Sequence, residues 1–302
     1  NSVSLTTTKK GNAAQSRLDV NVSTGIQDVP QRIEMLGKDD HIKFWKEVTA
    51  ANWAAVGGNP NTPNGQRVHN NSKSMVNYPA MYDNPATAPD VDWQDWIFRN
   101  NALVSNVQAS AQGGTDKIRY FVSGNYFTQD GIVKATDFKR YTARVNLDAT
   151  VTKNLRVGMS LSPSYSKENR RWTDGHINSG VLDANVILSA LVQPPTIVPK
   201  TPAGLYDGIM AGNDPFLSVG YAATAGHPLQ PLEDPNYKWY EEGFRWLGSA
   251  YGELDIIKNL TLRSTFGFDS RNTGNNKYRP STVSRVSNPV LTVWQPNPNV
   301  VN

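Results

Sequence analysis

The sequence has no cysteine, which excludes disulfide scaffolds, thiolate metal sites and cysteine nucleophiles. Long apolar runs are also missing: the mean hydropathy is −0.51, and no stretch approaches the roughly 18 apolar residues of a transmembrane helix. The start of the chain shows no basic segment followed by an apolar one, so we expect no signal peptide. The opening residues, NSVSLTTTKKG, look like a strand from inside a protein, so we expect a processed protein or a fragment.

The sequence has neither a concentrated basic or acidic region nor a recognisable catalytic motif. The formal net charge is +4, and because the basic residues are scattered we expect no nucleic-acid partner. The four histidines are widely spaced, and no HExxH, P-loop, GxGxxG or GxSxG motif is present. We therefore expect a protein that is not an enzyme, with no catalytic residue, no metal site and no cofactor.

Two acidic groups resemble active or metal sites but have simpler interpretations. Asp90, Asp92 and Asp95 lack the glycine and distal glutamate of a calcium loop, so capping is favoured. Glu241 and Glu242 are neighbours on an expected strand. Because adjacent strand residues point to opposite faces, the two carboxyl groups are poorly placed to flank one glycosidic bond.

Aromatic residues and alternating segments are abundant. The chain has 12 Tyr, 9 Phe and 8 Trp, and its alternating segments place apolar side chains on one face and polar side chains on the other, which predicts β-strands. The clearest is LRVGMSLSPSY, from residue 155. Seven strands are expected in all, and they begin near residues 17, 103, 117, 139, 155, 244 and 260.

The connections between these strands alternate between long and short. Tight turns are expected at 113–116, 152–154 and 258–259. Long loops are expected at about 27–103, 129–136, 167–242 and 271–302. Up-and-down strands with all short turns at one end and all long loops at the other are typical of transmembrane barrels. The sequence therefore predicts an all-β fold, a segment of an antiparallel up-and-down transmembrane β-barrel with extracellular loops.

Aromatic residues near the long loops support this interpretation. Tyr126, Tyr141, Tyr165 and Phe268 lie on the apolar faces toward the loop ends of their strands, where membrane-interface aromatics are expected. The alternative is a soluble β-sandwich, in which one half-buried face shows the same alternation. The polar faces carry many charges, such as Arg140, Arg144 and Asp148, which fit a wide barrel with a wet or plugged lumen.

The loops hold one expected helix and the candidate ligand-binding residues. Asp39 and Asp40 are expected to cap a short helix in the first long loop. The second long loop combines a flat aromatic ring with polar groups, a combination that suits sugar or peptide recognition. The ligand-binding candidates are Arg170, Trp172, Asp174, His176 and Trp93. The open alternative is that Trp172 and other aromatics of the mouth, such as Trp239, pack the loops.

Four strings resemble the SusC/RagA-like TonB-dependent transporters. LTTTKKG at 5–11 resembles the family's last plug strand, and DVDWQDWIFR at 90–99 resembles the entry to its second barrel strand. YFVSGNYFTQDGIVKATDFKRYTARVNLD at 120–148 and NLRVGMSLSPSYSKENR at 154–170 resemble its third to fifth strands. The strings occur in family order over about residues 1–170 and become weaker beyond.

The resemblance implies a domain division and a function. It assigns residues 1–11 to the end of a plug domain and 12–302 to the first part of a barrel of about 22 strands in the bacterial outer membrane. It implies TonB-dependent import of a large nutrient, an oligosaccharide or a peptide. The implied partners are a SusD-like lid lipoprotein, TonB through an upstream region, and outer-membrane lipid. Two alternatives remain: a surface adhesion barrel without transport, and a soluble β-rich carbohydrate-active enzyme.

Overall fold

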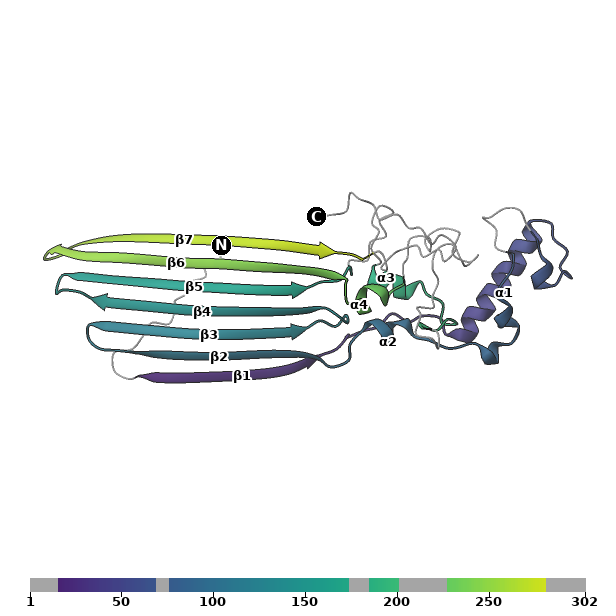
Figure 1. The fold of residues 1–302 in the computed structure, drawn as a ribbon, viewed down its shortest axis with the longest axis horizontal. Coiled ribbons are helices and arrows are strands. Elements are labelled where there is room, and N and C mark those ends of the chain that lie inside the picture. Colours follow the sequence, from purple (N-terminus) through teal and green to yellow (C-terminus); the bar gives the residue numbers. More distant parts are fainter. Residues whose placement is uncertain (1–15, 69–75, 174–184, 201–226, 281–302) are drawn as a thin grey trace.

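The computed structural model describes residues 16–68, 76–173, 185–200 and 227–280. Seven strands form one antiparallel sheet in chain order, β1 to β7, which confirms the expected up-and-down topology (Figure 1). The strands are β1 (Arg17–Gln27), β2 (Ala102–Gly114), β3 (Ile118–Asp130), β4 (Asp137–Thr150), β5 (Leu155–Asn169), β6 (Lys238–Ile257) and β7 (Leu260–Tyr278).

The short turns β2–β3, β4–β5 and β6–β7 all lie at one end of the sheet, and the longer connections lie at the other (Figure 1). In the tightest turn Asn259 takes a left-handed φ of 70°, a conformation that asparagine tolerates better than most residues. β6 has 20 residues and β7 has 19, longer than the roughly 9–11 that cross a bilayer. β6 begins at Lys238 and β7 ends at Tyr278. Both strands therefore extend into regions that the sequence predicted as loops, before residue 242 and after residue 271.

The helices lie among the loops (Figure 1). α1 (Lys38–Ala55) begins after Gly37, which is its N-cap, so the expected capping by Asp39 and Asp40 is wrong. Both carboxylates lie in the first helical turn instead, where they favour the positive end of the helix dipole. None of the described helices is long and apolar enough to cross a membrane.

The loops hold more than the one short helix that the sequence predicted. Short apolar stretches such as VILSAL carry too little periodicity to be recognised as helices. The additional helices are α2 (Trp93–Ile97), α3 (Val186–Leu191), α4 (Gln230–Glu233), η1 (Asn64–Gln66), η2 (Ala80–Asp83) and η3 (Pro85–Thr87).

The buried core lies in the loops and not on the sheet. α2 and α3 pack together around Ile97, which has no exposed surface, and Trp93, Val133 and Leu229 join the same cluster. The sheet is a single layer that leaves large apolar side chains exposed, such as Phe266 at 69%. A soluble domain rarely leaves an apolar face of this extent uncovered.

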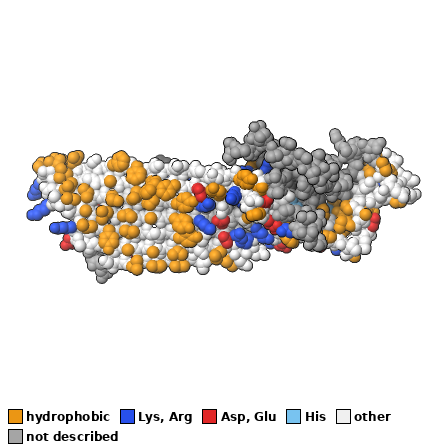
Figure 2. Space-filling view, viewed as in Figure 1, with side chains coloured by type: hydrophobic (Ala, Val, Ile, Leu, Met, Phe, Trp, Pro, Cys, Tyr) orange, Lys and Arg blue, Asp and Glu red, His pale blue; other side chains and the backbone are white. Residues whose placement is uncertain are grey.

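The two faces of the sheet differ in chemistry. Figure 2 shows an apolar band over the sheet, with charged side chains between this band and the loops. We call this side of the sheet the apolar face. The opposite, polar face carries ion pairs between strands, including Arg156–Glu253 at 2.6 Å and Arg245–Asp269 at 2.5 Å.

Candidate functional site

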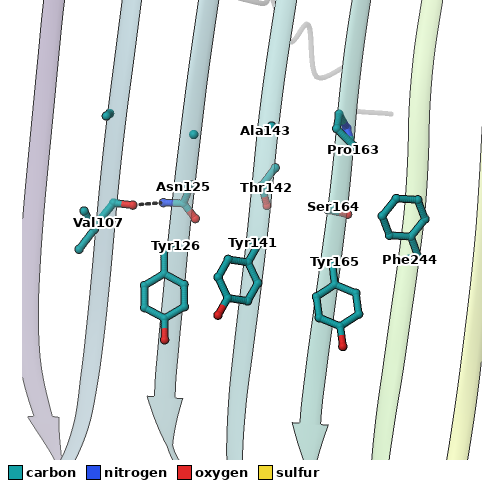
Figure 3. A pocket seen from close by; sticks show the side chains of 12 residues that line it. Val107, Asn125, Tyr126, Tyr141, Thr142, Ala143, Pro163, Ser164, Tyr165 and Phe244 are labelled. Atoms are coloured by element: carbon teal, nitrogen blue, oxygen red, sulfur yellow. Dashed lines mark hydrogen bonds between the residues drawn. The ribbon is translucent and has the colours of Figure 1, made fainter.

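Four aromatic rings form a row across the apolar face near its loop end. The strand register aligns Tyr126 with Tyr141, Tyr141 with Tyr165, and Tyr165 with Phe244. The ring centroids of Tyr126 and Tyr141 are 4.9 Å apart, and those of Tyr141 and Tyr165 are 6.3 Å apart. We call these four residues the aromatic row (Figure 3). Amphipathic rings at one level suit a membrane interface.

Phe268, the fourth aromatic that the sequence placed at this interface, does not belong to the row. It pairs with Gly248, which pairs with Leu161, four residues along β5 from Tyr165 and closer to the short turns. A Cβ added at Gly248 would collide with the Phe268 ring, so the glycine provides the space in which the ring lies over β6. Phe268 therefore lies within the apolar band.

A second group lies on the polar face where β5, β6 and β7 reach the loops. The rings of Trp172 and Trp239 are 6.0 Å apart, and Lys277 Nζ lies 4.3 Å from the Trp239 centroid and 5.1 Å from that of Trp172. Arg170 stacks on Trp239 at 5.6 Å and donates to Glu241 Oε2 at 3.0 Å. We call these five residues the mouth cluster.

The strand register holds the mouth cluster together. Trp239 pairs with Lys277, and the Trp239 indole donates to Asn275 Oδ1 at 3.1 Å. The backbone N–H of Arg170 donates to the Trp239 carbonyl at 2.8 Å. Cations stacked on indole faces contribute about 0.5–2 kcal/mol. The cluster therefore presents flat rings, donors and a carboxylate in one fixed arrangement.

The other ligand-binding candidates lie elsewhere. Asp174 and His176 fall outside the described residues. Trp93 is only 3% exposed, and its indole donates to the Pro194 carbonyl at 2.9 Å inside the loop core. Of the two sequence interpretations of Trp93, packing is the one that its position supports.

Asp92, Glu241 and Glu242 follow their simpler interpretations, whereas Asp95 pairs with Arg32. Asp92 is the N-cap of α2, and its carboxylate accepts from the Gln94 backbone N–H at 2.8 Å. Glu241 contacts Arg170 at 3.0 Å, whereas its neighbour Glu242 contacts Lys167 at 2.8 Å on the other face of the sheet. The two glutamates therefore serve separate ion pairs.

A cavity of about 480 Å³ lies between residues 32–37, the 90–94 segment and the α3 region. One of its lining residues is His41, whose ring nitrogen Nε2 is 3.2 Å from the Tyr82 hydroxyl. Burial lowers the pKa of His41 to about 4, because the charged imidazolium loses its hydration. His41 is therefore neutral at pH 7.

Sequence reasoning missed Phe244 and Lys277. Phe244 lies in a segment whose alternation is irregular, so its face was ambiguous. Lys277 lies beyond residue 271, where the sequence predicted a loop, although β7 runs to Tyr278. Residues 270–277 carry no apolar side chain on either face of β7, so they lack the apolar–polar alternation by which a strand is recognised.

The chain is similar in sequence to TonB-dependent receptors. No family model matches the chain. TonB-dependent receptor P3 of Formosa agariphila is 28% identical over 283 residues, which cover 94% of this chain and 24% of that protein. TonB-dependent receptor SusC of Bacteroides thetaiotaomicron is 29% identical over 175 residues, which cover 58% of this chain and 14% of that protein.

Solved structures give the same picture of the fold. The RagAB peptide importer in its 'open-open' state matches with a TM-score of 0.61 and 22% identity, over 88% of this chain and 29% of that one. Its 'closed-closed' state gives a TM-score of 0.60 over the same shares. The chain thus spans about a quarter of the length of the relatives P3 and SusC or less.

Proposed function

We propose that this chain, a homologue of the SusC/RagA-like TonB-dependent transporters, forms part of the wall and mouth of an importer in the bacterial outer membrane. One observation carries the proposal: a single-layer sheet of seven strands with one apolar face, one charged face and every long connection at the same end. A lipid-facing wall requires this arrangement, because its outside meets hydrocarbon and its inside meets water or a plug.

Closure of the wall is part of the proposal. β1 and β7 are the edge strands of the sheet, and unpaired strand edges within lipid cost several kcal/mol for each polar group. We infer that further strands pair with both edges, in the barrel of about 22 strands that the family resemblance implies. Residues 1–11, outside the described part, would then be the end of the plug.

The proposed cargo is a large nutrient, an oligosaccharide or a peptide, and it would pass the mouth cluster. The flat rings of Trp172 and Trp239 suit the apolar faces of sugars and of peptide side chains. Arg170, Glu241 and Lys277 supply charged and hydrogen-bonding groups beside these rings. A peptide stays among the proposed cargoes, because the RagAB structures that share the fold are those of a peptide importer.

The proposed partners follow from the same relatives. TonB would act through a region upstream of this chain, and a SusD-like lipoprotein would cover the loop end. The connections β1–β2 and β5–β6 pack together through α2 and α3 at that end, which gives such a lid a folded surface to contact.

The test uses the full-length protein. Membrane fractionation and gel migration before and after boiling should show an outer-membrane protein whose unheated form migrates differently, because closed barrels resist detergent at room temperature. Uptake of labelled oligosaccharides and peptides should require TonB. Binding to cells without TonB-dependent uptake would favour the adhesion alternative, and a fully water-soluble protein would contradict the proposal.

A further inference from the structure

A shallow hollow of about 550 Å³ opens on the apolar face beside the aromatic row. The rings of the aromatic row form one side of the hollow (Figure 3). Next to the rings, toward the short turns, the register places compact residues side by side, with Ala109 paired to Gly124 and Gly124 paired to Ala143. Because large rings adjoin small side chains, the wall is indented at this level.

The hollow is complete within this chain. Its lining residues come from β2 to β6, between Val107 and Phe244. Strands that close the barrel would pair with the edges of β1 and β7, so they would not cover it. The hollow also lies on the face opposite to the mouth cluster, away from any cargo or plug.

The loop side of the hollow is polar. The hydroxyls of Tyr126 and Tyr165 point away from the compact residues toward the loop end, where β3 and β5 finish (Figure 3). Lys139 and Lys167 lie on the same face, each closer to the loop end than the tyrosine two residues away on its strand. The tyrosines are Tyr141 on β4 and Tyr165 on β5, and two residues of an extended strand span about 7 Å. From the short-turn side toward the loop end, the site therefore presents apolar side chains, then phenolic hydroxyls, then lysine side chains.

The two lysines differ in how firmly they are paired. Lys167 Nζ contacts Glu242 Oε1 at 2.8 Å and lies 4.3 Å from the Tyr240 ring centroid. Lys139 has a side chain that is 47% exposed and a longer contact of 4.0 Å with Asp137. Lys139 is thus the cation that can exchange its weak partner for an external anion.

We propose that this hollow binds one acyl chain of an anionic, phosphorylated lipid of the outer leaflet, with the phosphate at Lys139. The inference rests on the proposed function, since it needs the apolar face to meet lipid. Because surrounding hydrocarbon is as apolar as the hollow, retention of one lipid must come from close packing against the rings and from the charge contact. The Tyr126 hydroxyl between the two would donate to the lipid's ester or phosphate oxygens, whereas the Tyr165 hydroxyl already donates to Glu242 Oε1 at 3.0 Å.

Filling the hollow tests the proposal directly. A Cβ added at Gly124 has no atom within 4 Å, so Gly124→Leu can direct its side chain into the hollow with no clash at its Cβ. Gly252→Leu is the matched control, because an added Cβ at Gly252 is equally free and Gly252 lies on the same face outside the hollow. The full-length protein would be analysed by native mass spectrometry in mild detergent with added phosphatidylglycerol or phosphatidylcholine.

The wild type and Gly252→Leu should retain phosphatidylglycerol in preference to phosphatidylcholine, and Gly124→Leu should lose the bound lipid. Lys139→Gln should keep lipid binding and lose the preference for the anionic headgroup. Equal retention by Gly124→Leu and Gly252→Leu would overturn the inference. So would a lipid-free dimer that Gly124→Leu dissociates, because a second copy would then fill the hollow. The gel shift on boiling reports separately on the proposed function.

Discussion

The Tyr251 hydroxyl donates a hydrogen bond to Asp148 Oδ1 at 2.5 Å across the intervening strand β5. The tyrosine can cross β5 because Gly158, which pairs with both residues, has no side chain. A Cβ at that position would collide with the tyrosine ring. Arg263 stacks on the same ring at 4.4 Å. This group ties β4, β5, β6 and β7 together on the polar face.

Gly158→Val should therefore destabilise the sheet. The added side chain would displace the Tyr251 ring and break its hydrogen bond to the Asp148 carboxylate. Loss of a hydrogen bond to a charged group costs about 1.5–3 kcal/mol, to which the steric displacement adds. Gly252→Val is the control, since Gly252 adjoins Tyr251 in sequence and its added Cβ meets no atom within 4 Å. Urea unfolding in detergent measures both; equal midpoints would contradict this account of Gly158.

The aromatic row predicts a difference between loss of a ring and loss of a hydroxyl. Tyr141→Ala should lower stability in a bilayer by about 1 kcal/mol or more, because aromatic pairs contribute about 0.5–1.5 kcal/mol beyond their buried area and Tyr141 contacts two rings. Tyr141→Phe should remain close to the wild type. Unfolding in lipid vesicles compares the two, and equal losses would show that the hydroxyl, not the ring, matters.

The mouth cluster predicts a specific loss of cargo binding. Trp239→Ala removes the ring on which Arg170 and Lys277 both stack, so TonB-dependent uptake should fall while the amount of protein in the membrane stays unchanged. Trp246→Ala is the control, because Trp246 is a 41% exposed tryptophan that pairs with Pro163 on the opposite, apolar face. Normal uptake by Trp239→Ala would remove the mouth cluster from the proposed route.

His41 predicts acid sensitivity of the loops. Its pKa is about 4 in the folded protein, below the ordinary 6.5, so the unfolded segment binds more protons between these values. Stability from neutral His41 is therefore complete above about pH 6.5 and falls as the pH drops toward 4. The protection factors of the α1 amides, which correct exchange rates for the intrinsic pH dependence of amide exchange, should fall on acidification over this range. His41→Phe keeps an aromatic ring and should remove the pH dependence of α1 stability. If the variant kept the pH dependence of the wild type, His41 would not be its cause.

Local alternation and loop chemistry were enough to predict much of the architecture. Strict alternation in β5, from Leu155 to Leu161, and the turns at Thr152 and Asn259 predict strands, faces and topology, because a strand with one apolar side follows a two-residue period. The aligned row of Tyr126, Tyr141 and Tyr165 could be predicted only in part. Alternation fixes the face of each residue, whereas the level across strands depends on the register.

The sites in the loops could not be predicted in the same way. Trp93 and Trp172 are both aromatic residues among polar neighbours, yet one is in the loop core and the other faces Trp239 and Lys277. These positions depend on contacts between residues far apart in the chain, such as Trp93 with Pro194. No local period encodes such contacts, so composition offered both interpretations for each tryptophan.

The central claim is that one face of this sheet meets lipid and the other meets water. The chain has no native cysteine, so single cysteines at successive positions of β4, residues 142–147, can be labelled in the full-length protein within outer membranes. Any cysteine elsewhere would first be replaced. Water-soluble maleimide should label positions 142 and 144 and spare 143, 145 and 147; position 146, where Asn146 is only 5% exposed, should label more slowly than 142 and 144. Equal labelling at all six positions would contradict the account.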